Sequence, residues 1–259
     1  AHARLARTGP ALDPPPVIPH EPPRCPMEIV IYVYEGLTAL DAIGPYEVLS
    51  RLPKARIRFV AEQAGDVTTD TGFLRIGAEA GIDEVKHADI LVVPGATVGF
   101  LRQTKKPHVL DWIRRMHETT SWTTSVCTGS IILAATGLLD GLRATSHWGA
   151  IDLLRDYGAV PTPERYIREG KIVTAQGVSA GIDMALYLAR EIAGTKHAEA
   201  TQLGIEYLPQ PPVNSGPFTK ARPETIRAAR WILAHDARRD LSVADAVRHA
   251  GPLLRMGRG

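Results

Sequence analysis

Short β-branched and aromatic runs alternate with helical segments through the first half of this 259-residue chain. Each run has the length and composition of a buried strand. The runs are EIVIYVY (28–34), RIRFVAE (56–62), DILVVPG (89–95) and WTTSV (122–126). Helical patterns lie between them, which favours right-handed crossovers between parallel strands. The alternation therefore predicts an α/β fold with a mostly parallel sheet and helices on both faces.

The segments that follow extend this pattern. A strand end and a helix closed by Gly158 are expected in residues 144–158, and a hairpin turning at Glu169 and Gly170 in residues 165–177. Residues 179–194 are apolar nearly all round, which predicts a helix buried within the body and ended by Gly194. A further helix is expected over residues 196–208.

The two ends of the chain differ from this middle part, which we take as residues 27–217. Residues 1–26 are rich in proline and have no periodic apolar face, so we interpret them as an N-terminal extension. Residues 218–259 contain two amphipathic helical patterns joined at RRDLS. This tail resembles a truncated helix-turn-helix of the AraC type. The alternative is a pair of helices packed on the body or on a partner subunit.

Composition narrows the classes of partner. The chain has 30 basic and 28 acidic residues, so no strong field favours nucleic acid or a membrane surface. The apolar runs are shorter than the ~20 residues that span a bilayer, and the start of the chain has no signal-peptide core. We therefore expect a cytoplasmic protein. The chain has two cysteines, Cys25 and Cys127, which lie in different settings. We therefore do not expect a disulfide between them.

Cys127 is the first candidate for chemistry. It lies between the run WTTSV and a helical pattern, and Gly129 permits close backbone approach there. This position corresponds to a nucleophile elbow at the carboxyl edge of the sheet, where ligands bind in such folds. The amides of a helix N-terminus would lower the pKa of the thiol. The alternative is that Cys127 is a small buried apolar residue.

Several linked motifs resemble the ThiJ/PfpI superfamily of glutamine amidotransferase-like folds, and within it the isonitrile (isocyanide) hydratases. They are LDAIGPYEV, VVPGA, SVCTGSIILAATGLLDG, RATSHWG and GVSAGIDMAL, in that order, followed by EYLPQPPVNSG. The resemblance spans about residues 27–217. It implies a flavodoxin-like three-layer sandwich that works without a cofactor, forms a homodimer and hydrates an isonitrile to an N-substituted formamide.

The resemblance also implies roles for individual residues. Cys127 would be the nucleophile and Asp41 its acid/base partner, while Thr128 stands where many relatives have histidine. Burial would raise the pKa of Asp41 so that it can donate a proton and then take one from water. Its alternative role is to cap the helix that begins near Ala42.

Backbone groups and a loop complete the predicted site. The amides of Gly95 and Ala96 are candidates for an oxyanion hole, although alanine would be strained there if that backbone had positive φ. Gly177 and Val178 are placed as a wall or lid of the pocket from their position in the chain.

Other polar residues are given structural roles. We interpret His147 as a satisfied structural histidine and Asp183 as a partner for buried backbone or for a subunit contact. No metal-ligand spacing, dinucleotide fingerprint or P-loop is present, so we predict neither a metal nor a cofactor. Two other functions stay open. One is the small-molecule-sensing domain of an AraC-type regulator, and the other is a redox or glyoxalase-type enzyme.

Overall fold

The computed structural model describes residues 26–240. Nearly all of the predicted N-terminal extension, with Cys25, lies outside the described residues. So does the second helical pattern of the predicted tail.

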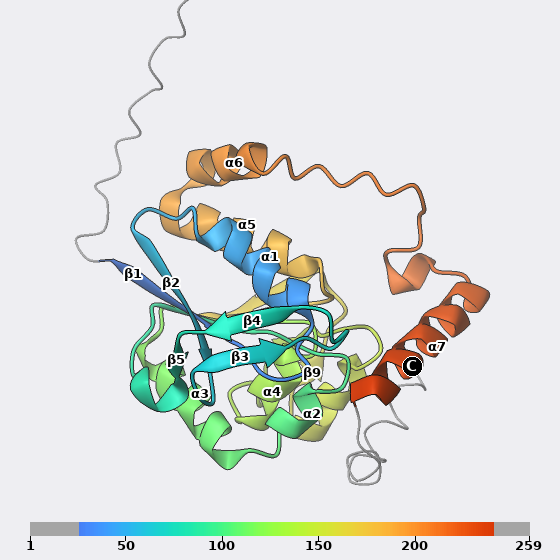
Figure 1. Ribbon diagram of the computed structural model, residues 1–259. Coiled ribbons are helices and arrows are strands. Elements are labelled where there is room, and N and C mark those ends of the chain that lie inside the picture. The colour runs from blue at the N-terminus through green and yellow to red at the C-terminus, as the bar shows by residue number, and fades with distance from the viewer. Residues whose placement is uncertain (1–25, 241–259) are drawn as a thin grey trace, which may run out of the picture.

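A seven-stranded sheet forms the centre of the molecule (Figure 1). Its strand order is β10-β11-β7-β6-β1-β2-β5, and β10, which pairs antiparallel with β11, is the exception to parallel pairing. The strands are β1 Met27–Tyr32, β2 Ala55–Ala61, β5 Ala80–Gly81, β6 Ile90–Val93, β7 Trp122–Val126, β10 Tyr166–Glu169 and β11 Ile172–Ala175.

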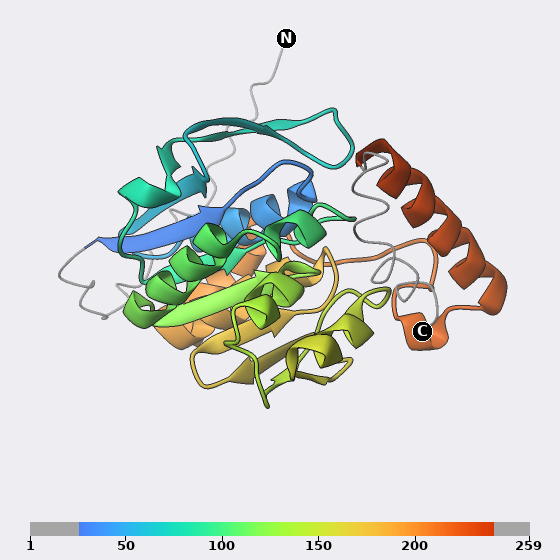
Figure 2. The ribbon, with the colours of Figure 1, turned by 90° about the horizontal axis from the view of Figure 1, so that it is seen from below.

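Helices cover both faces of the sheet, as the two views show (Figures 1 and 2). On one face, α1 packs on α5 and α5 packs on α6; on the other, α4 packs with α2 and α3. The helices are α1 Ala39–Leu49, α2 Phe100–Gln103, α3 Pro107–Thr119, α4 Gly129–Ala135, α5 Ala180–Ala193 and α6 Thr195–Gly204. The predicted flavodoxin-like three-layer sandwich is confirmed.

Smaller elements lie outside the three layers. They are the hairpin β3 Gly65–Thr68 with β4 Arg75–Ala78, the pair β8 Arg143–Ala144 with β9 Val160–Pro161, the 3-10 turns η1 Ile82–Glu84, η2 Ile151–Tyr157 and η3 Phe218–Lys220, and helix α7 Pro223–Asp240. An extended segment leaves α6 and leads to η3 and α7 (Figure 1).

Two helical segments differ from their predictions. The segment that ends at Gly158 is a 3-10 helix, although Gly158 does close it with φ +78°. The helix expected over 196–208 ends at Gly204, since glycine is a weak helix former and Pro209 disfavours helical backbone just before it.

The core lies on both sides of the central strands. All four residues of β6 are buried, as expected for a parallel strand covered on both faces. Helix α3 turns one apolar face inward, with Val109, Trp112, Ile113 and Met116 at most 1% exposed. Full burial of a large apolar side chain stabilises a fold by about 1.5–3 kcal/mol. The central strands are therefore a rigid support for the loops at their ends.

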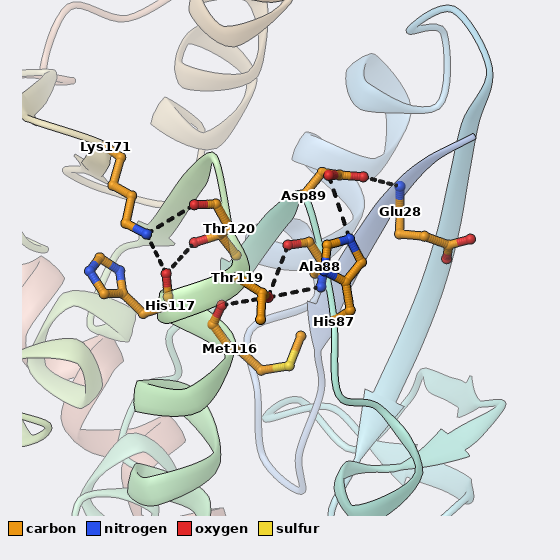
Figure 3. A network of polar contacts seen from close by, with 9 residues as sticks. All are labelled: Glu28, His87, Ala88, Asp89, Met116, His117, Thr119, Thr120 and Lys171. Carbon is orange, nitrogen blue, oxygen red and sulfur yellow. Dashed lines mark hydrogen bonds and ion pairs between the residues drawn. The ribbon is translucent and has the colours of Figure 1, made fainter. Parts of the chain in front are cut away.

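The amino-terminal edge of the sheet is held by a network of polar contacts (Figure 3). Lys171 Nζ donates to the carbonyl oxygens of His117 and Thr120 at the end of α3. Asp89 Oδ2 accepts the backbone N–H of Glu28 at 2.8 Å. These contacts satisfy backbone groups that the helix end and the strand edge leave unpaired. These contacts support the fold, and they lie at the edge of the sheet opposite the candidate site.

Candidate active site

Cys127 lies in the turn between β7 and α4, at the carboxyl edge of the sheet, as the sequence predicts. Its φ is +58°, a left-handed conformation that non-glycine residues seldom adopt. Hydrogen bonds on both sides of the residue fix this backbone. The amide donates to Ala175 O at 3.0 Å, and the carbonyl accepts the hydroxyls of Ser130 at 3.0 Å and Ser146 at 3.1 Å.

Gly129 allows this turn to pass close to the neighbouring strand. A Cβ on Gly129 would lie 2.0 Å from Val93 O and 2.9 Å from the carbonyl carbon of Pro94. No side chain fits in that space. The predicted need for glycine at this position is confirmed.

Asp41 comes from the first turn of α1 and is completely buried. The helix begins at Ala39 with Thr38 as N-cap, so the alternative interpretation of Asp41 as the cap is wrong. Its Oδ2 instead accepts the amide N–H of Gly95 at 2.9 Å. Its Oδ1 has no nitrogen or oxygen partner among residues 26–240. The carboxyl therefore points across to the loop after β6.

The side chains of Cys127 and Asp41 lie close enough together that each shifts the pKa of the other. Burial raises the pKa of Asp41 from 3.8 to about 7, against the opposing effects of the Gly95 amide and the thiol. The raised pKa of Asp41 agrees with the expectation from sequence. At neutral pH this carboxyl is thus poised between its acid and its base form.

The pKa of Cys127 is raised well above its ordinary value, first by burial and then by the Asp41 carboxylate. The prediction of a lowered pKa is wrong for this state of the protein. The Thr128 amide and hydroxyl do favour the thiolate, but loss of water and a negative neighbour outweigh them. Cys127 is also 4% exposed, so the sulfur is less accessible than the sequence suggested. The cysteine and the carboxyl are best regarded as a pair that shares a proton.

Thr128 links the cysteine turn to the loop after β6. Its hydroxyl donates to Ala96 O at 2.8 Å and accepts from Ala96 N at 2.9 Å. The amide of Ala96 is therefore already occupied, as is that of Gly95, which bonds Asp41. Both amides proposed for an oxyanion hole thus have partners in the protein and would have to exchange them to bind an intermediate. Ala96 is not among the described non-glycine residues with positive φ, so the expected strain does not arise.

Gly177 and Val178 lie in the loop after β11, the strand beside β7. Both are half-buried, and Val178 packs on the core. A Cβ on Gly177 would lie 3.8 Å from Cδ2 of His147. The loop is thus at the same edge as Cys127, next to the segment that carries Ser146 and His147.

His147 has the structural surroundings that the sequence suggested, whereas Asp183 forms a partly exposed ion pair where a bond to buried backbone or a subunit contact was expected. Burial lowers the pKa of His147 to about 4, so its ring is neutral at neutral pH, and Nδ1 accepts the Gly149 amide at 3.2 Å. Asp183 pairs with Arg165 at 2.5 Å. Neither residue is a proton carrier for Cys127 in this arrangement.

Two titratable residues near the site were missed from the sequence. Tyr34 is buried just after β1 and donates its hydroxyl to Pro94 O at 3.0 Å. Its position at the carboxyl end of a strand could have identified it as a site residue from the sequence. Asp70 comes from the β3–β4 hairpin, and no motif marks it.

The described part of the chain contains neither a cluster of metal-ligating side chains nor a helix that could span a membrane. Within residues 26–240, no group of three or more His, Cys, Asp or Glu side chains is placed to hold a metal ion. Nor does any helix in this range have the length and apolar character needed to span a bilayer.

Comparison with known proteins places this site in a family. The model of the DJ-1/PfpI family matches residues 27–191, and the chain belongs to that family. It is 39% identical over 205 residues to the isonitrile hydratase of Pseudomonas putida, which covers 79% of this chain and 89% of that protein. The resemblance deduced from sequence motifs is confirmed.

Two further relatives have different descriptions. A ThiJ/PfpI family protein from Pseudomonas syringae has a solved structure with a TM-score of 0.79 and 31% identity, covering 94% of this chain and 98% of that one. The transcriptional regulator CdhR of Pseudomonas aeruginosa is 30% identical over 61% of this chain, which corresponds to 48% of the regulator.

Proposed function

We propose that this protein hydrates an isonitrile to an N-substituted formamide, with Cys127 as nucleophile and Asp41 as acid and base. The observation that carries the proposal is the electrostatic coupling of Cys127 to a buried Asp41 whose pKa is about 7. Similarity to an isonitrile hydratase over most of both chains supports it.

The reaction proceeds through the minor form of the pair, in which the proton has moved from sulfur to the Asp41 carboxylate and the sulfur is a thiolate. The thiolate attacks the terminal carbon of the isonitrile and forms a C–S bond. Asp41 gives its proton to the same carbon, which produces a thioimidate. The Thr128 amide stabilises the thiolate before attack.

Water then resolves the thioimidate. Its oxygen adds to the carbon while the Asp41 carboxylate takes a proton. The other hydrogen of the water ends on nitrogen as the carbonyl forms. The C–S bond breaks with its electron pair on sulfur, and the pair returns to its starting form. The loop with Gly177 and Val178 forms one wall of the substrate pocket in this proposal.

The test is direct. Purified protein is mixed with an aryl or alkyl isonitrile, and loss of isonitrile and appearance of formamide are followed together. Cys127→Ala should abolish both, whereas Cys25→Ser, the matched change at the other cysteine, should leave them intact. Full turnover by the Cys127→Ala protein would remove this mechanism.

A second candidate is the sensing domain of an AraC-type regulator, and similarity to CdhR favours it. In this case the pair would bind a small molecule without turnover. A salt-dependent shift of duplex DNA by the purified chain would support the regulator, as would isonitrile binding without formamide release.

We also propose that the chain forms homodimers. Leu203 of α6 and Leu208 and Val213 of the following segment are 77%, 73% and 69% exposed, an apolar set that a second copy would cover. Sedimentation velocity should give a dimer. Leu203→Ser combined with Leu208→Ser should weaken it, and a monomeric parent protein would refute the proposal.

A further inference from the structure

The β3–β4 hairpin brings Asp70 to the carboxyl edge of the sheet. Its turn is joined to the loop before α1 by a β-bridge between Leu37 and Thr69. Backbone hydrogen bonds from Gly36 N to Thr68 O at 2.8 Å and from Asp70 N to Leu37 O at 2.9 Å hold the two segments together. Asp70 is therefore fixed beside the start of α1, although the hairpin is not part of the central sheet.

The Asp70 carboxyl connects two loops of the site. Its Oδ2 accepts the hydroxyl of Thr38 at 2.6 Å and the hydroxyl of Thr97 at 3.0 Å. Thr38 is the N-cap of α1, the helix that carries Asp41. Thr97 follows Gly95 and Ala96 directly, in the loop after β6.

Thr38 uses its hydroxyl in an unusual way for an N-cap. It makes no side-chain bond to the helix and donates to Asp70 instead. Its amide donates to Gly95 O at 3.0 Å, while the Gly95 amide donates to Asp41. The two loops are thus tied by backbone bonds at Gly95 and by one carboxyl at Asp70.

We propose that Asp70 is a positioning residue of the Cys127–Asp41 site. It ties the loop that presents Asp41 to the loop that presents Gly95, and its negative charge disfavours a second negative charge on Asp41. This inference rests on the proposed function for its role in turnover. The effect of the Asp70 charge on the pair can be tested without any isonitrile.

The charge of Asp70 acts on Asp41 as well. The groups that face Asp41 are Cys127 from the β7–α4 turn, Tyr34 from the end of β1 and Asp70 from the hairpin. Asp70 raises the pKa of Asp41 because two carboxylates at close range disfavour a second negative charge. Asp70 therefore helps to keep the proton that the thiolate attack consumes.

The experiment replaces Asp70 by asparagine, which keeps an oxygen acceptor for both threonine hydroxyls and removes the charge. Asp66→Asn is the matched control, since it removes a carboxylate from the exposed β3 strand of the same hairpin. The first readout is the rate of alkylation of Cys127 by iodoacetamide against pH, measured on the Cys127 peptide in a Cys25→Ser background. The second is the pH profile of isonitrile turnover.

Asp70→Asn should move the first rise of the alkylation profile toward lower pH by roughly half to one pH unit, because the first proton of the Cys127–Asp41 pair is then lost more easily. Asp66→Asn should leave it in place. Thermal unfolding of each variant verifies that it is folded. If both variants are folded and their alkylation profiles are the same as that of the parent, the role of the Asp70 charge is overturned.

Thr38→Val and Thr97→Val test the tie separately, because they remove the hydroxyls and leave the charge. Each should lower turnover severalfold without moving the alkylation profile as far as Asp70→Asn does. Unchanged turnover in the double variant would overturn the tie. A parent protein that turns over no isonitrile refutes the proposed function, whereas the alkylation profiles still decide the charge effect of Asp70.

Discussion

Replacing Asp41 by asparagine tests whether this carboxyl is held protonated by its surroundings. Asparagine has nearly the same shape, and its oxygen can still accept the Gly95 amide that lies 2.9 Å from Oδ2. The substitution therefore removes the titration and preserves most of the packing. Its effect on stability should depend on pH, which a simple loss of packing would not.

The sign follows from the proton bound at Asp41. The folded pKa is about 7 and the ordinary value is 3.8, so between these values the folded protein holds a proton that the unfolded chain has lost. Stability of the parent therefore falls as pH rises from about 4 to about 7 and is constant above that. A rise from 3.8 to about 7 corresponds to about 4 kcal/mol at 1.36 kcal/mol per pKa unit. This is the largest gain that Asp41→Asn can show relative to the parent.

The assay is urea unfolding of both proteins at several pH values from about 4 to about 8, with the difference in unfolding free energy as the result. His147 acts in the opposite direction, because its lowered pKa of about 4 makes stability fall as pH drops below 6.5. Both proteins contain His147, so its effect cancels in the difference. A difference that stays constant over the whole range would refute a buried, protonated Asp41.

Three other substitutions test other parts of the structure. Gly129→Ala should destabilise the protein by several kcal/mol in thermal unfolding, because the added Cβ would lie 2.0 Å from a carbonyl oxygen. Gly204→Ala is the control: nothing lies within 4 Å of the added Cβ, so stability should change by about 1 kcal/mol or less. Phe218→Ala removes the ring stacked at 5.0 Å on Trp148 and should speed proteolysis of the C-terminal segment; an unchanged cleavage rate would show that the stack does not hold it. Lys171→Met should lower the unfolding free energy by about 1–3 kcal/mol, since the half-buried carbonyl of Thr120 loses the lysine donor and that of His117 keeps only the Thr120 hydroxyl. It should leave kcat unchanged because the network lies at the far edge of the sheet, and a large loss of kcat would contradict this separation.

The position of the site followed from sequence because it depends on local pattern and on a general rule of the fold. Parallel strands direct their carboxyl ends to one edge. The residues after those ends, among them Gly95 and Cys127, had therefore to meet there. Asp41 joined them because α1 follows β1 directly and starts at the same edge.

The electrostatics of the site did not follow from sequence. The sign of the change in the pKa of Cys127 depends on how much water and which charges reach the sulfur, and neither is encoded in the local pattern. Occupation of the Gly95 and Ala96 amides likewise depends on side chains from α1 and from the β7–α4 turn. Asp70 was missed because a hairpin outside the sheet carries it to the site, and only tertiary contacts such as the Leu37–Thr69 bridge decide where it lies.

The raised pKa values bear on the choice among chemistries for this cysteine. A redox-active thiol works best as a standing thiolate, which a lowered pKa supplies. Here burial and Asp41 hold the sulfur and the carboxyl together around a shared proton. Such a pair suits an electrophile in which one carbon takes up both sulfur and hydrogen. Protonation of that carbon then removes the negative charge that attack by the sulfur creates there. The terminal carbon of an isonitrile has this property, whereas in a peroxide the sulfur goes to one oxygen and the proton to the other, which leaves as water.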